Sequence, residues 1–359
     1  MIDRGKFTLD WITKISKENR NADKILVEKV IHALLLLEGL VKQKIPFVFK
    51  GGTALMLHFN SSKRLSIDID IIISEIPENL DELLGNVSSQ QGFVRKESQL
   101  RNANSKIEKA HYKFFYNPYY KTSKEEEYVL LDILFEEVQY KNLVELSIKS
   151  SFLPDNETPL TVISASIEDL AGDKLTAFAP NTTGIPYYKG KDSMSMEIIK
   201  QLYDIGNLID YVTDLETIKT TFRKYVTTEL EYREMNTISE KDVLNDIYQT
   251  SLCIVTRGSM GKGDFNQLQQ GIQQVSRFIF SESYHIEKAT THASKAAYIA
   301  TLIKHNAKTI EKYGNPLKMK DWIISEPINT KLNKLKKSNP EAFYYWYKIY
   351  ELENHALTR

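Results

Sequence analysis

The 359-residue sequence has little of several features that would assign it to a familiar class of protein. Its single cysteine, Cys253, excludes an intrachain disulfide framework and a cysteine-rich zinc site. The longest apolar run, Ala33 to Leu37, is far too short for a membrane span, and no signal pattern opens the sequence, so we expect a cytoplasmic protein without a membrane partner. Lysine plus arginine equals aspartate plus glutamate at 47 each, so overall charge does not indicate a nucleic-acid partner, which would need a local basic patch.

The segment from Ile45 to Phe59 predicts a short buried strand, a glycine turn and a helix in succession. Gly51 and Gly52 separate an apolar run from residues that have the composition of a helix start. Such a junction presents free backbone N–H groups and the positive end of the helix dipole, and glycine lets a phosphate approach because it has no Cβ. We therefore expect a triphosphate cradle at Gly51, Gly52 and Thr53, with the threonine hydroxyl as one more donor.

A strict alternation after Arg64 predicts a strand with one acidic face. Ser66, Asp68 and Asp70 lie on that face, and isoleucines occupy the other. Carboxylates at i and i+2 on a strand lie about 7 Å apart at their Cα atoms, close enough to reach one Mg²⁺ or to bracket two. The alternative is an edge strand with a solvated acidic face, and the glycine turn upstream favours the metal site.

The segments Gly51 to Leu55 and Arg64 to Asp70 closely resemble the first motif of the AbiEii/AbiGii toxin nucleotidyltransferases, in the polymerase-β-like superfamily. The superfamily pattern is a Gly-Ser or Gly-Thr pair, a helix, and Asp-x-Asp on the next strand. The resemblance implies that Lys50, Arg64 and Ser66 join the glycine turn in binding the nucleotide. It also implies a third carboxylate on a later strand.

Asp132 is our candidate for that third carboxylate. It is the one acid in the otherwise apolar run from Tyr128 to Phe135, where an acid needs a partner or a metal. The alternating segment from Lys109 to Tyr116 predicts a hairpin with this strand, connected through residues 117–127. If the strand order matches the resemblance, the hairpin brings Asp132 beside Asp68 and Asp70.

Two later segments resemble further motifs of the family. Asp169 to Phe178 resembles a motif in which an acid precedes a lysine by about one helical turn, which carries over to Lys174 as a cation for the triphosphate. The alternative for Lys174 is a surface lysine paired with Asp169 or Asp173.

The helix expected from Met196 to Leu208 resembles the last family motif, in which a basic residue stands four positions before an aspartate. Lys200 and Asp204 then share one helical face, and an intrahelical salt bridge is the alternative explanation. Tyr203 and the pair Gly206-Asn207 depart from the motif, which favours Asp204 over Lys200 as the functional residue.

These features predict an α+β fold in two parts, because the chain is longer than one hydrophobic core usually serves. We expect a polymerase-β-like nucleotidyltransferase domain with a mixed sheet and N-terminal helices at residues 1–165. A mainly α-helical C-terminal domain at residues 166–359 would contribute Lys174 and Asp204 to the cleft. The basic segment from Lys331 to Lys337 is either a solvated helix face or an RNA contact.

The resemblance implies a Mg²⁺-dependent enzyme, with Mn²⁺ as a substitute, that transfers a nucleoside monophosphate from an NTP to an acceptor hydroxyl. Asp68, Asp70 and Asp132 would hold the metal. It further implies the toxin of a bacterial toxin–antitoxin or phage-defence (abortive infection) pair, with a separately encoded antitoxin and tRNA or another RNA 3′ end as acceptor. The alternatives are a nucleotidyltransferase that modifies a small molecule or a protein, and a non-catalytic nucleotide-binding module.

Overall fold

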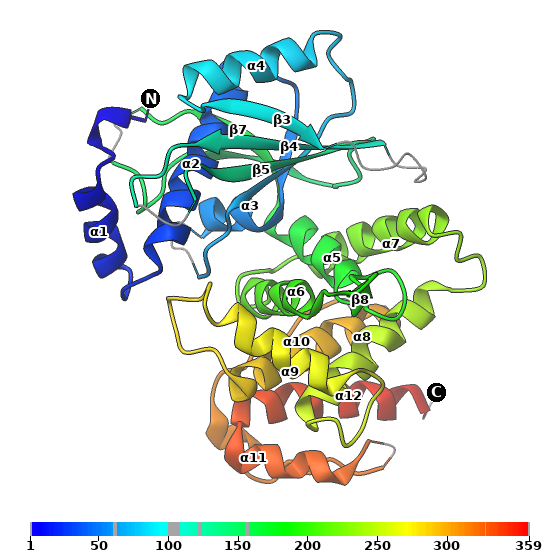
Figure 1. Ribbon diagram of the computed structural model, residues 1–359. Coiled ribbons are helices and arrows are strands. Elements are labelled where there is room, and N and C mark those ends of the chain that lie inside the picture. The colour runs from blue at the N-terminus through cyan, green and yellow to red at the C-terminus, as the bar shows by residue number, and fades with distance from the viewer. Residues whose placement is uncertain are drawn as a thin grey trace. The chain divides into compact units, whose positions relative to one another are not determined.

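The computed structural model describes residues 2–59, 63–99, 108–120, 124–154, 158–326 and 328–357. The chain forms two compact units, one from Met1–Ser166 together with Arg277–Ser283 and the other from Ile167–Ser276 together with Tyr284–Arg359. The first unit contains a large sheet with helices, and the second is mainly helical (Figure 1).

A seven-stranded mixed sheet organises the first unit, in the order β3-β4-β5-β2-β1-β7-β6. Its strands are β1 (Val48–Lys50), β2 (Asp68–Ile72), β3 (Arg95–Gln99), β4 (Glu108–Tyr116), β5 (Glu127–Phe135), β6 (Leu143–Ser147) and β7 (Thr161–Ala165). β2 and β5 run parallel, as do β1 and β7, and the other neighbours are antiparallel. The mixed sheet followed by helices confirms the predicted fold class.

β4 and β5 form the predicted hairpin, and β5 lies next to β2. Part of the expected connection, residues 121–123, lies outside the described residues. Along β5, Val129, Leu131 and Ile133 are fully buried, whereas Asp132 is only partly buried and points to the opposite face. The sheet therefore has one apolar face and one face that carries the acids.

The helices of the first unit include α1 (Leu9–Glu18), α2 (Lys24–Lys42), α3 (Gly51–His58) and α4 (Leu80–Gln90). Asp23 is the N-cap of α2, and its carboxylate accepts from the N–H groups of Ile25 and Leu26 at 2.8 and 3.2 Å. It covers the apolar face, since His32 stacks on Tyr116 of β4 with ring centroids 3.6 Å apart. α4 packs against α2 and β3 (Figure 1).

Two features of this unit were not predicted. β6 is an edge strand with no buried residue, so it lacks the apolar alternation that identifies a strand. The segment Arg277–Ser283 returns to the first unit, where the carbonyl of Phe278 accepts from the N–H of Leu65 at 2.8 Å. A contact between residues so far apart in sequence leaves no local pattern.

The second unit contains α5 (Ile167–Ala177), α6 (Ser195–Leu208), α7 (Leu215–Tyr232), α8 (Glu240–Val255), α9 (Phe265–Val275), α10 (Ile286–Lys304), α11 (Leu335–Ser338), α12 (Pro340–Leu357) and a two-strand ribbon, β8 (Tyr188–Lys189) with β9 (Asp192–Ser193). α10 is its central helix and packs against α6, α8 and α12. Phe343, Tyr345 and Trp346 of α12 are buried, so these aromatic side chains form helix-packing contacts. Lys331–Lys337 spans a 3₁₀ turn and the start of α11.

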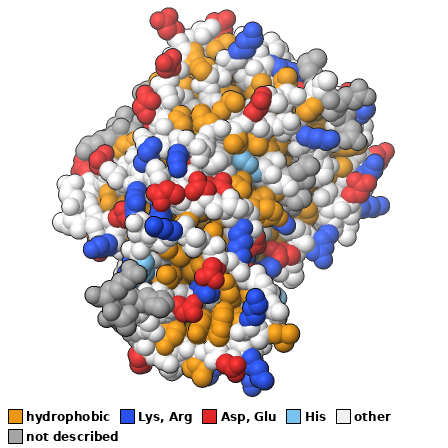
Figure 2. All heavy atoms as spheres, turned by 180° about the vertical axis from the view of Figure 1, so that it is seen from behind, with side chains coloured by type: hydrophobic (Ala, Val, Ile, Leu, Met, Phe, Trp, Pro, Cys, Tyr) orange, Lys and Arg blue, Asp and Glu red, His pale blue; other side chains and the backbone are white. Residues whose placement is uncertain are grey.

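In the ranges that the structure describes, no helix has both the length and the apolar character needed to cross a membrane. On the face drawn in Figure 2, acidic and basic side chains are interspersed and neither sign forms a broad patch. This distribution agrees with the formal net charge of zero. On that face, recognition of an anion would depend on individual side chains and not on an extended basic surface.

Candidate active site

The glycine turn joins β1 directly to α3, as the sequence predicts. Gly51 has φ +80°, in the left-handed region that favours glycine. A Cβ on Gly51 would overlap the carboxylate of Asp70, and a Cβ on Gly52 would lie 2.6 Å from both Nη2 of Arg64 and Oγ of Ser66. The space that we expected to serve a phosphate is thus bordered by the protein's own acidic and basic side chains.

Thr53 lies in the first turn of α3, but its hydroxyl does not serve as predicted. The side chain is fully buried, and Oγ1 donates to the carbonyl of Asp68 at 2.6 Å. A hydroxyl has one proton to donate, so this group is not a further donor for phosphate. It instead ties α3 to the beginning of β2, and the backbone N–H groups of the first turn remain the expected phosphate donors.

Three aspartates lie on the polar face of the central strands. Asp68 and Asp70 alternate along β2 with the buried Ile69 and Ile71. Asp70 is the register partner of Asp132 on the neighbouring parallel strand, so their Cα atoms are about 4.8 Å apart and their side chains leave the same face. The structure therefore brings the three predicted acids to one side of the sheet.

Across the strands, these acids form part of a continuous row. Lys50 of β1 pairs with Asp70, Asp70 with Asp132, and Asp132 with His111 of β4. His111 Nδ1 lies 2.5 Å from Oδ1 of Asp132. Sequence reasoning did not select His111, although the alternation of β4 and the hairpin register together would have placed it beside Asp132.

Arg64 provides positive charge near the start of α3. Only 7% of its surface is exposed, and its guanidinium lies against Gly52 while Nη1 donates to the carbonyl of Leu65 at 3.2 Å. A planar guanidinium and the N-terminus of a helix both favour an anion, so the first turn of α3 has the electrostatic character of a phosphate site.

Lys174 and Asp204, from the second unit, form a buried ion pair between α5 and α6. Nζ of Lys174 lies 2.8 Å from Oδ2 of Asp204 and also donates to Gln201 at 3.0 Å. Lys174 is not the surface lysine of the alternative interpretation, since it is 6% exposed. Lys200 forms an ion pair with Glu197 at 2.9 Å. The packing of α5 against α6 thus gives Asp204 a partner from another helix.

Gly206, which departs from the family motif, lies where α6 meets α10. A Cβ at this position would overlap the imidazole of His292, and Nζ of Lys295 donates to the Gly206 carbonyl at 3.2 Å. Burial lowers the pKa of His292 well below its usual value, so this imidazole is neutral. The departure is explained by close helix packing.

Comparison with known families identifies the chain. The family model described as "Nucleotidyl transferase AbiEii toxin, Type IV TA system" matches residues 35–273, more than half of the sequence. The chain belongs to the AbiEii family of nucleotidyltransferase toxins. The family consists of nucleotidyltransferases of type IV toxin–antitoxin systems, which implies an NTP substrate and a separate antitoxin.

Two solved structures from Helicobacter pylori are similar to this AbiEii-family chain. A candidate nucleotidyltransferase is 17% identical, with a TM-score of 0.40, and the match covers 78% of this chain and 94% of that one. JHP933 is 16% identical, with a TM-score of 0.39, and the match covers 78% and 90%. No curated protein sequence matches the chain. The family assignment therefore depends on the family model.

The donor set of this AbiEii-family protein suits one kind of metal. Among the described residues, no group of three or more His, Cys, Asp or Glu side chains is arranged to hold a metal ion by itself. Mg²⁺, however, normally takes one or two carboxylates and completes its octahedral shell with water and substrate phosphate oxygens. Asp70 beside Asp132, with Asp68 two residues away on β2, fits an ion that arrives with the triphosphate.

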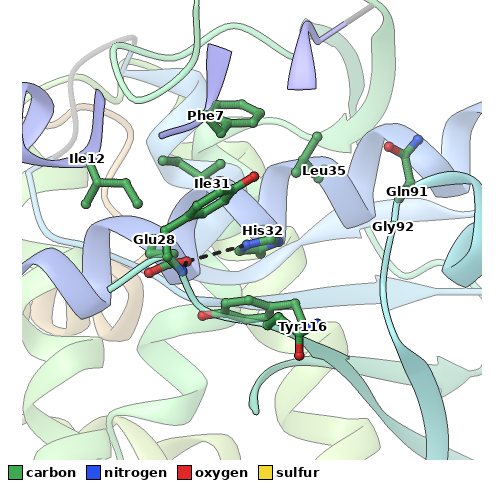
Figure 3. Close-up of a pocket in the computed structure, with 11 residues that line it drawn as sticks. Phe7, Ile12, Glu28, Ile31, His32, Leu35, Gln91, Gly92 and Tyr116 are labelled. Atoms are coloured by element: carbon green, nitrogen blue, oxygen red, sulfur yellow. Dashed lines mark hydrogen bonds and ion pairs between the residues drawn. The ribbon is translucent and has the colours of Figure 1, made fainter. Parts of the chain in front are cut away.

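A separate cavity of about 300 Å³ lies on the other face of the sheet (Figure 3). Glu28 and His32 of α2 line it, with 4.0 Å between Oε1 and Nε2, and Tyr116 packs beneath His32. Tyr116 alternates with His111 along β4, so this cavity is on the opposite side of the sheet from the three aspartates. Oε1 of Glu28 accepts from the N–H of Tyr119 at 2.6 Å, which indicates a structural role for this carboxylate.

Proposed function

We propose that this AbiEii-family protein transfers a nucleoside monophosphate from an NTP to an acceptor hydroxyl, with tRNA or another RNA 3′ end as the acceptor. The observation that carries the proposal is the register pairing of Asp70 with Asp132 directly beside the Gly51 turn. Two acids placed side by side in this way repel one another, and such an arrangement is typical of a catalytic site and not of a structural one.

The triphosphate would bind at the N-terminus of α3. Its oxygens would accept hydrogen bonds from the N–H groups of Gly51, Gly52 and Thr53, and Arg64 would add a planar cation. Lys50, the last residue of β1, and Ser66, which precedes β2, complete this set. Each of these residues would stabilise the negative charge of the triphosphate, and that charge increases on pyrophosphate as it leaves.

Asp68, Asp70 and Asp132 would hold Mg²⁺, or Mn²⁺ in its place, and the bound ion supplies neutralisation of the phosphate charge. The acceptor oxygen forms a bond to the α-phosphorus as the bond from that phosphorus to the β-phosphate oxygen breaks. Pyrophosphate leaves with the electron pair, and the hydroxyl proton passes to a carboxylate oxygen of Asp132 or to water. Preorganised charges of this kind contribute most of the rate in phosphoryl-group chemistry.

Lys174 would stabilise the charge that develops on pyrophosphate, and Asp204 would hold the ammonium in place. The 2.8 Å ion pair supports the second role, because a buried lysine needs a partner to stay charged. In this proposal Lys174 and Asp204 act together, so replacing either residue removes the contributions of both.

The identity of the acceptor requires a test separate from that of nucleotide transfer. The membership of a toxin–antitoxin family supports an acceptor that the cell cannot spare, and a tRNA 3′ end offers an accessible hydroxyl in the cytoplasm. The same reasoning supports a role in phage defence by abortive infection. The rival acceptors are a protein side chain and a small molecule.

A panel of the four α-labelled NTPs, each with Mg²⁺ and either total RNA or total cell protein, separates these acceptors. We expect label in the small-RNA fraction with wild type and none with the matched variant Asp68→Asn. Label in protein would replace RNA as the acceptor. Tight NTP binding without any transfer or pyrophosphate release would favour a non-catalytic nucleotide-binding module.

A further inference from the structure

We propose that His111 is a positioning residue that fixes Asp132 for metal binding. This inference rests on the proposed function, because it assigns a partner to one of the three proposed metal ligands. Its basis is the contact between His111 Nδ1 and Asp132 Oδ1, at 2.5 Å, in the row of side chains across the sheet.

The chemistry of the two groups determines the direction of this hydrogen bond. An ionised carboxylate can only accept hydrogen bonds, so Nδ1 of His111 carries the proton and donates it. The short distance is typical of a hydrogen bond with a charged partner, which is about twice as strong as a neutral one. His111 keeps only 14% of its side-chain surface exposed, so the ring has little freedom to turn away.

The hydrogen bond determines which oxygen of Asp132 faces the substrate. Oδ1 is held by the imidazole, so Oδ2 is the oxygen left to bind a cation or to take the acceptor proton. Residues that hold a ligating side chain in this way typically change metal affinity or activity by about 10- to 100-fold when they are replaced.

The register explains why Asp132 requires such a restraint. Its neighbour on the other side is Asp70, a like charge about 4.8 Å away at the Cα atoms. Repulsion between the two carboxylates favours rotamers that point apart, whereas the binding of one cation would require both carboxylates. The hydrogen bond from the imidazole on the β4 side holds the Asp132 carboxylate in one orientation, and Lys50 occupies the equivalent position next to Asp70 on the β1 side.

A purely structural role makes a different prediction. If His111 only fills the polar face of β4, its replacement lowers stability without a specific effect on metal binding. Asn retains an N–H donor at nearly the position of Nδ1, whereas Ala removes it. Lys113 is the matched control, because it lies on the same face of β4 and contacts the ring of Tyr128, at 4.5 Å, in place of an aspartate.

The experiment measures Mn²⁺ binding by calorimetry and by electron paramagnetic resonance, in the presence of a non-hydrolysable NTP analogue. The full-length wild type is compared with His111→Ala, His111→Asn and Lys113→Ala. We expect His111→Ala to weaken Mn²⁺ binding about 10-fold or more, His111→Asn to restore most of it, and Lys113→Ala to match wild type. In parallel, nucleotide transfer by His111→Ala should need more Mg²⁺, while the KM for NTP at saturating Mg²⁺ stays within about twofold.

Two contrary results are distinguishable. If His111→Ala is folded by circular dichroism and binds Mn²⁺ as tightly as wild type, the role of His111 is overturned and the proposed function still stands. If His111→Ala is not folded, the comparison uses the other two variants. Equal weakening of Mn²⁺ binding in His111→Asn and Lys113→Ala would then also overturn the role of His111. Absence of both Mn²⁺ and NTP binding in wild type would reject the proposed function, and the role of His111 with it.

Discussion

Asp70 and Asp132 are register partners on two parallel strands, β2 and β5, and their carboxylates share the polar face of the sheet. Like charges placed opposite one another on a sheet are unfavourable by a few tenths to about 1 kcal/mol. The first unit retains this pair at the centre of its sheet, next to a glycine turn whose backbone could not carry a side chain without displacing Asp70. A cation-binding site formed by the two carboxylates explains this arrangement.

Asp70→Asn should therefore leave stability nearly intact while it removes activity. The substitution relieves repulsion with Asp132 and weakens attraction to Lys50, so we expect the free energy of unfolding to stay within about 1 kcal/mol of wild type. Urea denaturation followed by circular dichroism measures this difference. A loss of several kcal/mol would show that Asp70 holds the fold together and would weaken its assignment to catalysis.

Gly51→Ala should destabilise the first unit for two separable reasons. A positive φ costs a side chain about 1–2 kcal/mol, and overlap with the Asp70 carboxylate adds about 1–3 kcal/mol. Gly190→Ala is the control for φ alone, because Gly190 has φ +64° and open space around its Cβ. Gly314→Ala has neither strain nor overlap and should change stability by less than about 1 kcal/mol.

The ordering of these three variants is the test, measured as free energies of unfolding. We expect Gly51→Ala to lose most, Gly190→Ala to lose an intermediate amount and Gly314→Ala to lose least. Equal losses at Gly51 and Gly190 would show that the contact with Asp70 contributes nothing beyond the turn conformation.

Lys174→Ala should destabilise the second unit by about 3–5 kcal/mol, because it leaves the Asp204 carboxylate buried without its cation. The double substitution Lys174→Met with Asp204→Leu should recover most of this stability and none of the transfer activity. Lys200→Ala is the control, since its partner Glu197 is 34% exposed and such pairs contribute about 0–1 kcal/mol. Thermal unfolding together with a transfer assay separates the two effects. Recovery of activity in the double variant would exclude a catalytic role for Lys174.

Glu28 should make stability depend on pH. Burial raises the pKa of this carboxyl above 4.5, against the opposing hydrogen bonds from the N–H groups of Tyr119 and Tyr120, and the charge of Glu127 raises it further. A pKa that is higher in the folded state gives stability that is fully present below pH 4.5 and is lost as the pH rises through the folded pKa.

Wild type should consequently lose stability relative to Glu28→Gln between pH 4.5 and neutrality, because glutamine has no charge to desolvate. Chemical denaturation of both proteins at several pH values across this window gives the comparison. Parallel curves for the two proteins would contradict the assignment of the pKa shift to burial of Glu28.

Local patterns were enough to predict the central strands of the first unit and the helix α3 beside them. The glycine turn, the alternation that exposes Asp68 and Asp70, and the lone acid Asp132 are all visible within short segments, because each depends on neighbours in sequence. The side of the sheet on which Asp132 lies followed from the hairpin and the strand order.

Contacts between distant segments were the part that sequence reasoning missed. The register of β4 with β5 places His111 beside Asp132. Asp204 pairs with Lys174 of α5 because α6 packs on α5, and Lys200 of its own helix pairs with Glu197. The hydroxyl of Thr53 turned inward to the backbone of Asp68 for the same reason. Residue identity predicts which groups can react, whereas tertiary packing decides which of them meet.

Covalent transfer of label from an α-labelled NTP, measured for wild type, Asp70→Asn and Asp132→Asn at equal folded concentration, is the decisive measurement for the proposed active centre. We expect wild type to label an acceptor and release pyrophosphate, and each Asn variant to lose at least about 100-fold in rate, the scale expected when a preorganised electrostatic group is removed. Full transfer activity in either Asn variant would contradict the assignment of the Asp70 and Asp132 pair as the active centre.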